Sequence, residues 1–222
     1  MNSPTFASLI ALSLLASTPA ASQSADSAGS SPAGGLAETN GLPSGWTARP
    51  DDEGTADNIK FVVMEPGYHL TLGPATILYR KQDRVSGPFH AIAKFHQMKK
   101  LEHHEGYGLF FGGQELDGSN QSYTYFLVRS DGKFNVKRRN GEKLEQYTKG
   151  WVAHPAVKKV DAKGNATNVL EVDAKKDSRR VSFKVNGTEV HSVPAQKMDL
   201  DGIVGIRANH YLDMHIEEFA IH

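Results

Sequence analysis

From residue 59 onward, the hydrophobic residues of this sequence recur at every second position, and this spacing constrains the fold more than any other feature. Polar residues separate Val181, Phe183 and Val185, for example, and the same alternation runs through 89–95. A repeat of two places successive side chains on opposite faces of a β-strand, whereas an amphipathic helix repeats every ~3.6 residues. The pattern therefore predicts half-buried strands and leaves room only for helices of a single short turn.

Turn-forming residues separate the alternating segments. An Asn-Gly pair at 186–187 provides the two positive-φ positions of a type I′ hairpin turn, and the residues at 130–132 and 140–141 predict two further turns. The predicted strands are 59–64, 69–72, 76–80, 89–95, 106–111, 123–128, 134–138, 144–147, 168–172, 181–185, 190–193, 203–207 and 214–221. Strands at this spacing predict an all-β fold, a sandwich or barrel of antiparallel sheets.

The N-terminal part has a different composition. The first 25 residues carry no charged side chain, and their apolar run at 6–16 is about half the ~20 residues of a transmembrane helix. We therefore predict a signal peptide at 1–21, cleaved near residue 20, and a secreted or periplasmic protein with no transmembrane segment. Residues 22–44 are rich in Ala, Ser and Gly and predict a disordered linker, which leaves 45–222 as one domain.

Composition excludes several classes of function. The chain has 25 basic and 25 acidic side chains, and this balance predicts no nucleic-acid partner, because such partners require a basic excess or stripe. Cysteine is absent, which excludes disulfides, thiol nucleophiles and thiolate zinc sites. A hydrophobic content of 39% is enough for a packed core.

Several segments carry a resemblance to a known superfamily. They are GYGLFFGG at 106–113, YTYFLVRSDG at 123–132, NVLEV at 168–172, VSFKVNG at 181–187 and GIVGIR at 202–207. Their order over 45–222 resembles the concanavalin A-like lectin/glucanase superfamily, and within it the laminin G-like and bacterial 3-keto-disaccharide hydrolase-like domains. The resemblance implies a two-sheet jelly-roll sandwich whose concave sheet holds an extended carbohydrate or glycan-like polymer.

Glucanases of this superfamily that retain configuration have a Glu-x-Asp-x-x-Glu strand, in which alternation places both glutamates on one face. Two segments of this chain approach that motif, but Lys176 replaces the second glutamate after Glu171, and Asn120 replaces it after Glu115. Neither Lys nor Asn protonates a glycosidic leaving group as a carboxylic acid does. The sequence therefore predicts no glucanase carboxylate dyad, and Glu171 remains a candidate acid without its partner.

Histidines are concentrated between residues 90 and 105. His90 and His96 share one face of a predicted strand, and the segment 102–105 reads Glu-His-His-Glu. His96, His104 and Glu105 are candidate acid/base groups if the chain is a glycoside-cleaving enzyme similar to the 3-keto-disaccharide hydrolases. A solvated loop and the exposed side of a sheet explain the same residues equally well.

Two acidic segments suggest a calcium site. Asp199 and Asp201 are candidate ligands for a structural Ca²⁺, and the acidic residues at 51–53 offer further oxygens. An Asp-Gly pair is also a common turn former, and residues 51–53 are interpreted as part of a polar leader.

Aromatic and polar residues indicate where a sugar would bind. Strand parity places Tyr123, Tyr125 and Arg129 on one face. The full set of candidate ligand-binding residues is Tyr123, Tyr125, Arg129, His90, His96, Tyr147 and Arg139. The alternative is that these tyrosines cover a second core, and Trp46 and Trp151 are expected to close the ends of the sandwich.

The leading prediction is a secreted jelly-roll domain that binds carbohydrate. The alternatives are a glycoside-cleaving enzyme and a laminin G-like protein-interaction module. The sequence leaves the identity of the glycan, catalytic activity and the oligomeric state open.

Overall fold

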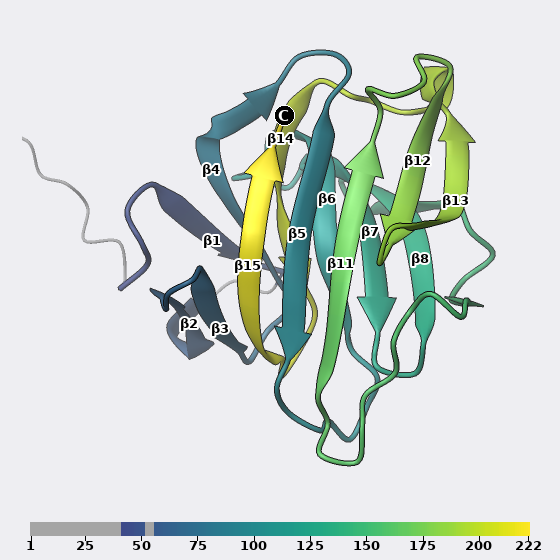
Figure 1. Ribbon diagram of the computed structural model, residues 1–222. Helices are drawn as coiled ribbons and strands as arrows, with labels where there is room; N and C mark the ends of the chain where they lie inside the picture. Colours follow the sequence, from purple (N-terminus) through teal and green to yellow (C-terminus); the bar gives the residue numbers. More distant parts are fainter. Residues whose placement is uncertain (1–40, 52–55) are drawn as a thin grey trace, which may run out of the picture. The chain divides into compact units, whose positions relative to one another are not determined.

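A computed structural model describes residues 41–51 and 56–222, which form two antiparallel β-sheets (Figure 1). The predicted signal peptide and most of the predicted linker lie outside the described residues. Helical structure in the described part is limited to two 3₁₀ turns, at Ala56–Asn58 and Ala195–Lys197, and no helix there is long and apolar enough to cross a membrane. The predicted all-β sandwich of two antiparallel sheets is confirmed.

The first sheet, called sheet A, has seven strands in one row and an eighth paired at its edge. In spatial order these are β1 (Trp46–Pro50), β4 (Thr76–Val85), β14 (Gly202–Ala208), β6 (Gly106–Gln114), β7 (Ser122–Arg129), β8 (Lys133–Asn140) and β10 (Val152–Ala153), and β9 (Lys143–Gln146) also pairs with β8. Strands β6 to β9 are consecutive antiparallel neighbours, and the predicted turns at 130–132 and 140–141 join β7, β8 and β9.

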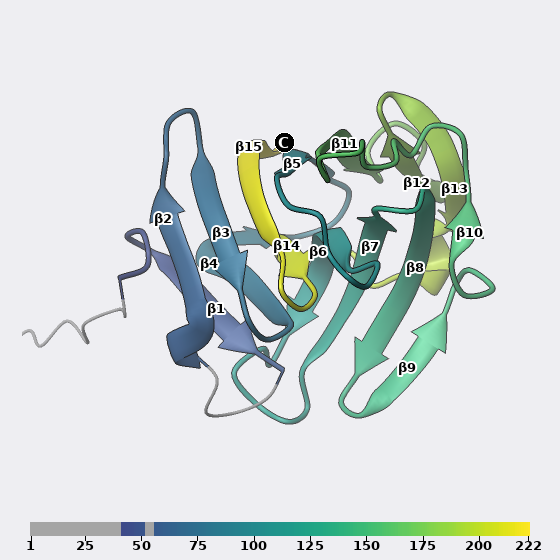
Figure 2. The same cartoon turned by 90° about the horizontal axis from the view of Figure 1, so that it is seen from below.

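The second sheet, called sheet B, has seven strands. In spatial order these are β13 (Thr188–Pro194), β12 (Arg180–Val185), β11 (Ala166–Asp173), β5 (His90–Gln97), β15 (Asp213–Ile221), β3 (Tyr68–Leu72) and β2 (Ile59–Val63). Seen from below, the two sheets form two layers, with β1 and β9 at opposite sides of sheet A (Figure 2).

The main core lies between the sheets, where the alternating apolar side chains of both meet. Phe183 of sheet B packs against Phe111 and Phe126 of sheet A, with ring centroids 6.2 and 5.2 Å apart. All three rings are fully buried, and each contributes roughly 1.5–3 kcal/mol of transfer free energy. The predicted period of two thus separates an inner face from an outer face in each sheet.

A second, smaller apolar cluster lies on the outer face of sheet A. It consists of Ile77, Tyr79, Phe110, Leu116, Tyr123 and Ile203, and Tyr125 packs at its edge. Gly205 makes room for this cluster, because a Cβ there would lie 2.5 Å from the Phe110 ring. One face of sheet A is therefore partly apolar on the side away from the main core.

The structure departs from the predicted strands in extent. Strand β4 continues to Val85 instead of ending at residue 80, and strands β1 and β10 were not predicted. Strand β1 has the sequence WTARP, a short segment that ends in proline, and β10 is only two residues long. Each of them is an edge strand of sheet A, hydrogen-bonded to one neighbouring strand only, and an edge strand tolerates proline.

Candidate functional site

Tyr123 and Tyr125 lie on the outer face of sheet A, on the same side of β7 as their sequence parity indicates. Tyr123 is only 1% exposed, because its ring packs against Phe110 with centroids 5.2 Å apart. Tyr125 is half-buried beside it, with ring centroids 5.9 Å apart. Tyr123 is thus a core residue of the second cluster, and Tyr125 is the ring that offers surface to a ligand.

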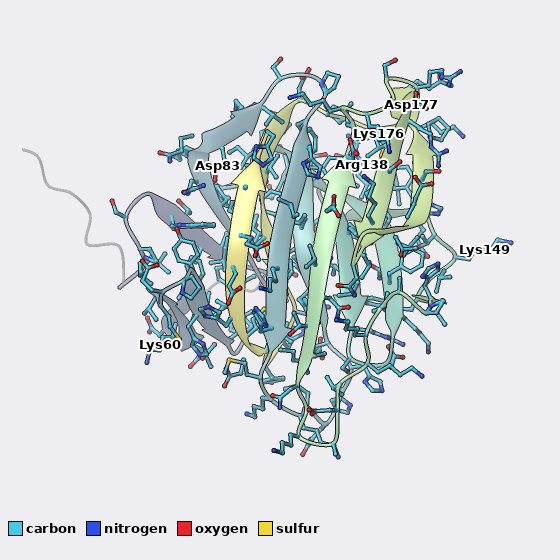
Figure 3. The ribbon with its side chains drawn as sticks, in the orientation of Figure 1. Lys60, Asp83, Arg138, Lys149, Lys176 and Asp177 are labelled. Atoms are coloured by element: carbon cyan, nitrogen blue, oxygen red, sulfur yellow. The ribbon has the colours of Figure 1, made fainter. Side chains whose placement is uncertain are left out.

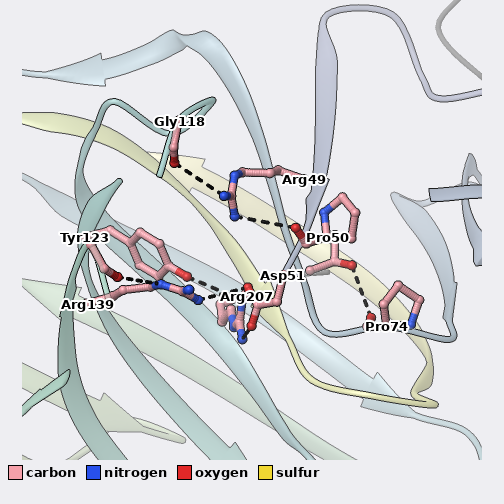
Figure 4. Close-up of polar contacts among 10 residues, drawn as sticks. Arg49, Pro50, Asp51, Pro74, Gly118, Tyr123, Arg139 and Arg207 are labelled. Atoms are coloured by element: carbon pink, nitrogen blue, oxygen red, sulfur yellow. Dashed lines mark hydrogen bonds and ion pairs between the residues drawn. The ribbon is translucent and has the colours of Figure 1, made fainter. Parts of the chain in front are cut away.

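An arginine–aspartate group lies next to Tyr123 (Figure 4), and its charges also act on Tyr125. Arg207 on β14 donates two hydrogen bonds to the two carboxylate oxygens of Asp51, at 2.7 and 2.6 Å. Arg139 on β8 donates to the same carboxylate at 3.2 Å. Two parallel N–H···O bonds fix the orientation of the Arg207 guanidinium relative to the Asp51 carboxylate. The arginine–aspartate group is therefore held in place before any ligand binds.

The charges in this group are stable at neutral pH. Burial alone would raise the pKa of Asp51, but the hydrogen bond and charge of Arg207, followed by the charges of Arg139 and Arg49, hold this pKa below its usual value. Burial also raises the pKa of the neighbouring Tyr125 hydroxyl, which therefore stays protonated. The face offers fixed charges beside a neutral phenol.

Further polar contacts extend the group toward the loop between β6 and β7. The Tyr123 hydroxyl accepts a hydrogen bond from Arg207 Nη1 at 3.4 Å, and Arg49 donates to the Gly118 carbonyl at 3.4 Å. In the same loop, Asp117 accepts a 2.5 Å hydrogen bond from the Tyr79 hydroxyl. The loop is thereby tied to β1 and β4 of sheet A.

A second aromatic ring lies at the far end of β7. The Arg129 guanidinium lies 4.6 Å from the centroid of the Trp151 ring and makes two hydrogen bonds to Asp131, at 2.7 and 2.9 Å. Trp151 is half-buried, whereas Trp46 is 2% exposed and belongs to the main core. The expectation that both tryptophans close the sandwich holds for Trp46 and is wrong for Trp151, which stacks on Arg129 outside the main core.

The other candidate ligand-binding residues lie elsewhere. The hydroxyl of Tyr147 donates to the Lys197 carbonyl at 2.9 Å, and its ring packs against the main core. His90 and His96 point outward from β5 of sheet B, the sheet that faces the viewer in Figure 3. The structure therefore brings together Tyr123, Tyr125, Arg129 and Arg139 on one sheet and separates the remaining candidates from them.

His96 belongs to a polar group on the outer face of sheet B. Its Nδ1 lies 2.9 Å from Thr167 Oγ1 and its Nε2 lies 3.3 Å from Glu217 Oε1. His215 pairs directly with His96 across β15 and β5, and its Nε2 lies 3.6 Å from the same Glu217 oxygen. These side chains line a cavity of about 420 Å³ together with Met64, Glu65, Gln97, Met98, Asn165 and Ala166.

The remaining catalytic candidates are scattered. His104 Nδ1 lies 2.6 Å from Ser130 Oγ, and Glu105 lies 3.8 Å from His210. Glu171 lies 3.1 Å from His90 and is on the outer face of sheet B. Glu171 lies within ion-pair distance of His90 and Lys184, and Lys184 also contacts the carboxylate of Asp173 at 2.8 Å, so the second acid near Glu171 is held by a lysine.

The predicted calcium ligands have structural contacts of their own. Asp201 Oδ1 accepts a hydrogen bond from the Gly87 N–H at 2.6 Å, which ties two loops together. Within 41–51 and 56–222, no group of three or more His, Asp or Glu side chains is arranged to hold a metal ion. The calcium site at Asp199 and Asp201 therefore stays a prediction without a ligand set in this part of the chain.

Sequence analysis missed the two residues at the centre of the outer face of sheet A. Asp51 was interpreted as part of a polar leader, and Arg207 was identified only as the end of a strand. The sequence could have identified Arg207, because the alternation of Ile203, Gly205 and Arg207 places this charged side chain on the face opposite the core. Its partner Asp51 lies 156 residues earlier in the sequence, and no local pattern identifies Asp51 as that partner.

Comparison with known proteins defines the fold. No family model and no curated protein matches the chain. Among solved structures, the carbohydrate-binding module CBM66 of Bacillus subtilis aligns with a TM-score of 0.54 and 10% identity over 80% of this chain and 94% of that one. A Bacteroides ovatus mixed-linkage glucan GH16 protein aligns with a TM-score of 0.54 and 11% identity over 83% and 98%.

A Bacillus subtilis protein of unknown function with a galectin-like fold gives a TM-score of 0.53 at 12% identity, over 80% of this chain and 88% of that one. At identities this low the alignments describe the fold and leave the activity open. Together with the two antiparallel sheets, they show that the chain has the two-sheet jelly-roll sandwich fold that the sequence predicts.

Proposed function

We propose that this chain is an exported carbohydrate-binding domain whose ligand lies across the outer face of sheet A. One observation carries the proposal: half-buried Tyr125 lies beside Asp51, Arg139 and Arg207, whose donors and acceptors are already fixed by their mutual hydrogen bonds. A sugar ring has an apolar C–H face and a rim of hydroxyl groups, so an aromatic surface bordered by rigid polar groups matches both.

Two further observations support the proposal. Trp151 and Arg129 lie at the other end of β7 and extend the surface along one strand direction, as an oligosaccharide would require. Solved proteins with the same fold include one named as a carbohydrate-binding module and one named as a mixed-linkage glucan GH16 protein. Export rests on the sequence of residues 1–21.

The proposal predicts that Tyr125→Ala weakens glycan binding about tenfold, because the stacking surface is lost. The measurement is a glycan-array screen with the purified domain, followed by titration calorimetry on the tightest ligand, for the parent protein and the variant. Tyr211→Ala is the matched control, since Tyr211 is 66% exposed in the turn between β14 and β15 and lies on neither sheet face.

The parent protein must bind a glycan, and the control must bind it equally well. If no glycan is retained, or if Tyr125→Ala binds as tightly as the parent, the proposed function is wrong. Circular dichroism melting of both variants verifies that the difference comes from the binding face and not from unfolding.

A second candidate function is glycoside cleavage, and the cavity on sheet B favours it. His96 and Glu217 both line it, and an imidazole and a carboxylate are side chains that general acid/base catalysis uses. The described residues that line this cavity include no arginine. Chromatography of the sugars recovered from the array experiment distinguishes the two functions, because cleavage yields shortened products that disappear in His96→Gln.

A further inference from the structure

Positive charge is in excess at the centre of the outer face of sheet A. Within the part of the chain that the structure describes, three guanidinium groups, those of Arg49, Arg139 and Arg207, surround the single carboxylate of Asp51. Arg49 makes its hydrogen bonds to two backbone carbonyls, at 3.4 and 3.5 Å, and it forms no ion pair with a carboxylate among the described residues. Lys137 is aligned directly with Tyr125 across β7 and β8 and adds another positive charge to this face.

Donor groups on this face lack acceptors. The Nε of Arg207 has no hydrogen-bond partner among the described residues, but it is buried and is not a donor that a surface ligand reaches. Arg139 uses Nε for the Gly141 carbonyl and Nη1 for Asp51, and no hydrogen bond is formed by its Nη2 in the same part of the chain. A guanidinium has five N–H donors and no acceptor, so the natural complement of these groups is an oxyanion.

The opposite sheet has a different charge arrangement. On the outer face of sheet B, Lys94 contacts Glu217 and Glu218 at 2.8 and 3.6 Å. Lys184 contacts Asp173 at 2.8 Å and Glu171 at 4.0 Å. Each of these lysines therefore has two carboxylate neighbours, although the chain as a whole has no net charge. The positive excess is a local property of the sheet that contains Tyr125.

We propose that the ligand of this face is an anionic glycan, one with carboxylate or sulfate groups on its sugar rings. The inference rests on the proposed function and adds the chemical class of the ligand. Tyr125 packs against a sugar ring, and the free donors of Arg49, Arg139 and Lys137 contact its oxyanion. Asp51 keeps the guanidinium groups in place and repels a wrongly placed anion.

The test uses pairs of polysaccharides that share a backbone and differ in charge. Polygalacturonate is compared with its highly methyl-esterified form, which isolates the carboxylate, and dextran sulfate is compared with dextran, which isolates the sulfate. Affinity is measured by calorimetry at pH 7 in low and high sodium chloride. At least one anionic member is expected to bind about tenfold or more tightly than its neutral partner, and high salt is expected to reduce this preference.

Variants separate a specific site from general attraction of a polyanion. Lys137→Gln and Arg49→Gln are each expected to weaken anionic binding severalfold while leaving neutral ligands unaffected. Lys176→Gln is the matched control, since Lys176 is exposed in the turn between β11 and β12 (Figure 3). Equal losses in Lys176→Gln and Lys137→Gln would show nonspecific ion exchange and overturn the inference.

The remaining outcomes are also decisive. Binding of neutral glycans through Tyr125 with no preference for the anionic member would leave the proposed function intact and overturn this inference alone. Binding of no glycan, charged or neutral, would overturn both. A carboxylate preference without a sulfate preference, or the reverse, identifies which oxyanion the face accepts.

Discussion

The Asp51 carboxylate connects segments that are far apart in the sequence. It directly follows β1 and accepts hydrogen bonds from Arg139 on β8 and Arg207 on β14. The Arg207 side chain is 9% exposed, so without Asp51 its charge would be buried with no carboxylate partner among the described residues. Removing one member of a buried ion pair destabilises a protein more than replacing both, because the remaining charge keeps its desolvation penalty.

At this scale we predict that Asp51→Asn lowers the free energy of unfolding at pH 7 by about 3 kcal/mol. The measurement is urea denaturation followed by tryptophan fluorescence. The exposed pair of Asp177 and Arg179 provides a matched control, and Asp177→Asn is expected to change stability by less than about 0.5 kcal/mol.

A double variant identifies the cause of the loss. If the uncompensated charge of Arg207 is responsible, Asp51→Asn combined with Arg207→Met is more stable than Asp51→Asn alone, because no buried charge remains. A double variant less stable than the single one would mean that packing by the Arg207 side chain, and not its charge, dominates.

At the scale of single elements, most strands were predictable because their cause is local. Alternation and turn chemistry identified the hairpin of β12 and β13, and Asn186 and Gly187 have the expected positive φ of 51° and 78°. Strand β1 was missed because it is only five residues long and ends in proline, which argues against a strand in a local reading. Its pairing with β4, from Trp46 opposite Arg80 to Pro50 opposite Thr76, depends on a neighbour that the local pattern does not reveal.

The turn between β12 and β13 gives an element-scale prediction. Gly187→Ala is expected to destabilise the domain by about 1 kcal/mol, because the positive φ is strained for a residue with a Cβ. No atom lies within 4 Å of the added Cβ, so a steric clash contributes nothing. Gly187→Asn, which tolerates the same backbone conformation, serves as the control in thermal melting and is expected to lose less stability. Equal losses in both variants would contradict the explanation by backbone strain.

At the scale of the whole molecule, the candidate site was only partly predictable. Strand parity correctly placed Tyr123, Tyr125 and Arg129 on one face, and it correctly placed His90 and His96 on one face. It did not show that these are outer faces of different sheets, because sheet membership is set by nonlocal pairing, such as that of β5 with β11 and β15. The sequence therefore produced one ligand set where the structure has two separate surfaces.

Carboxylates in both sheets link the stability of the whole domain to pH. Burial would raise the pKa of Asp51 in sheet A and of Asp173 in sheet B, but their partners outweigh it. Arg207 lowers the first pKa, and Lys184 together with backbone N–H groups lowers the second. The folded state therefore binds these protons less readily than the unfolded chain, whose aspartates titrate near a pKa of about 3.9. The resulting stabilisation is fully present above that pKa and is lost as the pH falls through the lower values of the folded state.

We therefore predict that the free energy of unfolding, measured by urea denaturation, declines between pH 5 and pH 3. The decline is expected to be smaller in Asp51→Asn and in Asp173→Asn, since each variant lacks one carboxylate that must be protonated at a depressed pKa. Asp199→Asn is the control, because the Asp199 side chain forms no ion pair within the described ranges, and it is expected to keep the full decline. Equal declines in all four proteins would show that acid destabilises the domain through groups other than these two buried pairs.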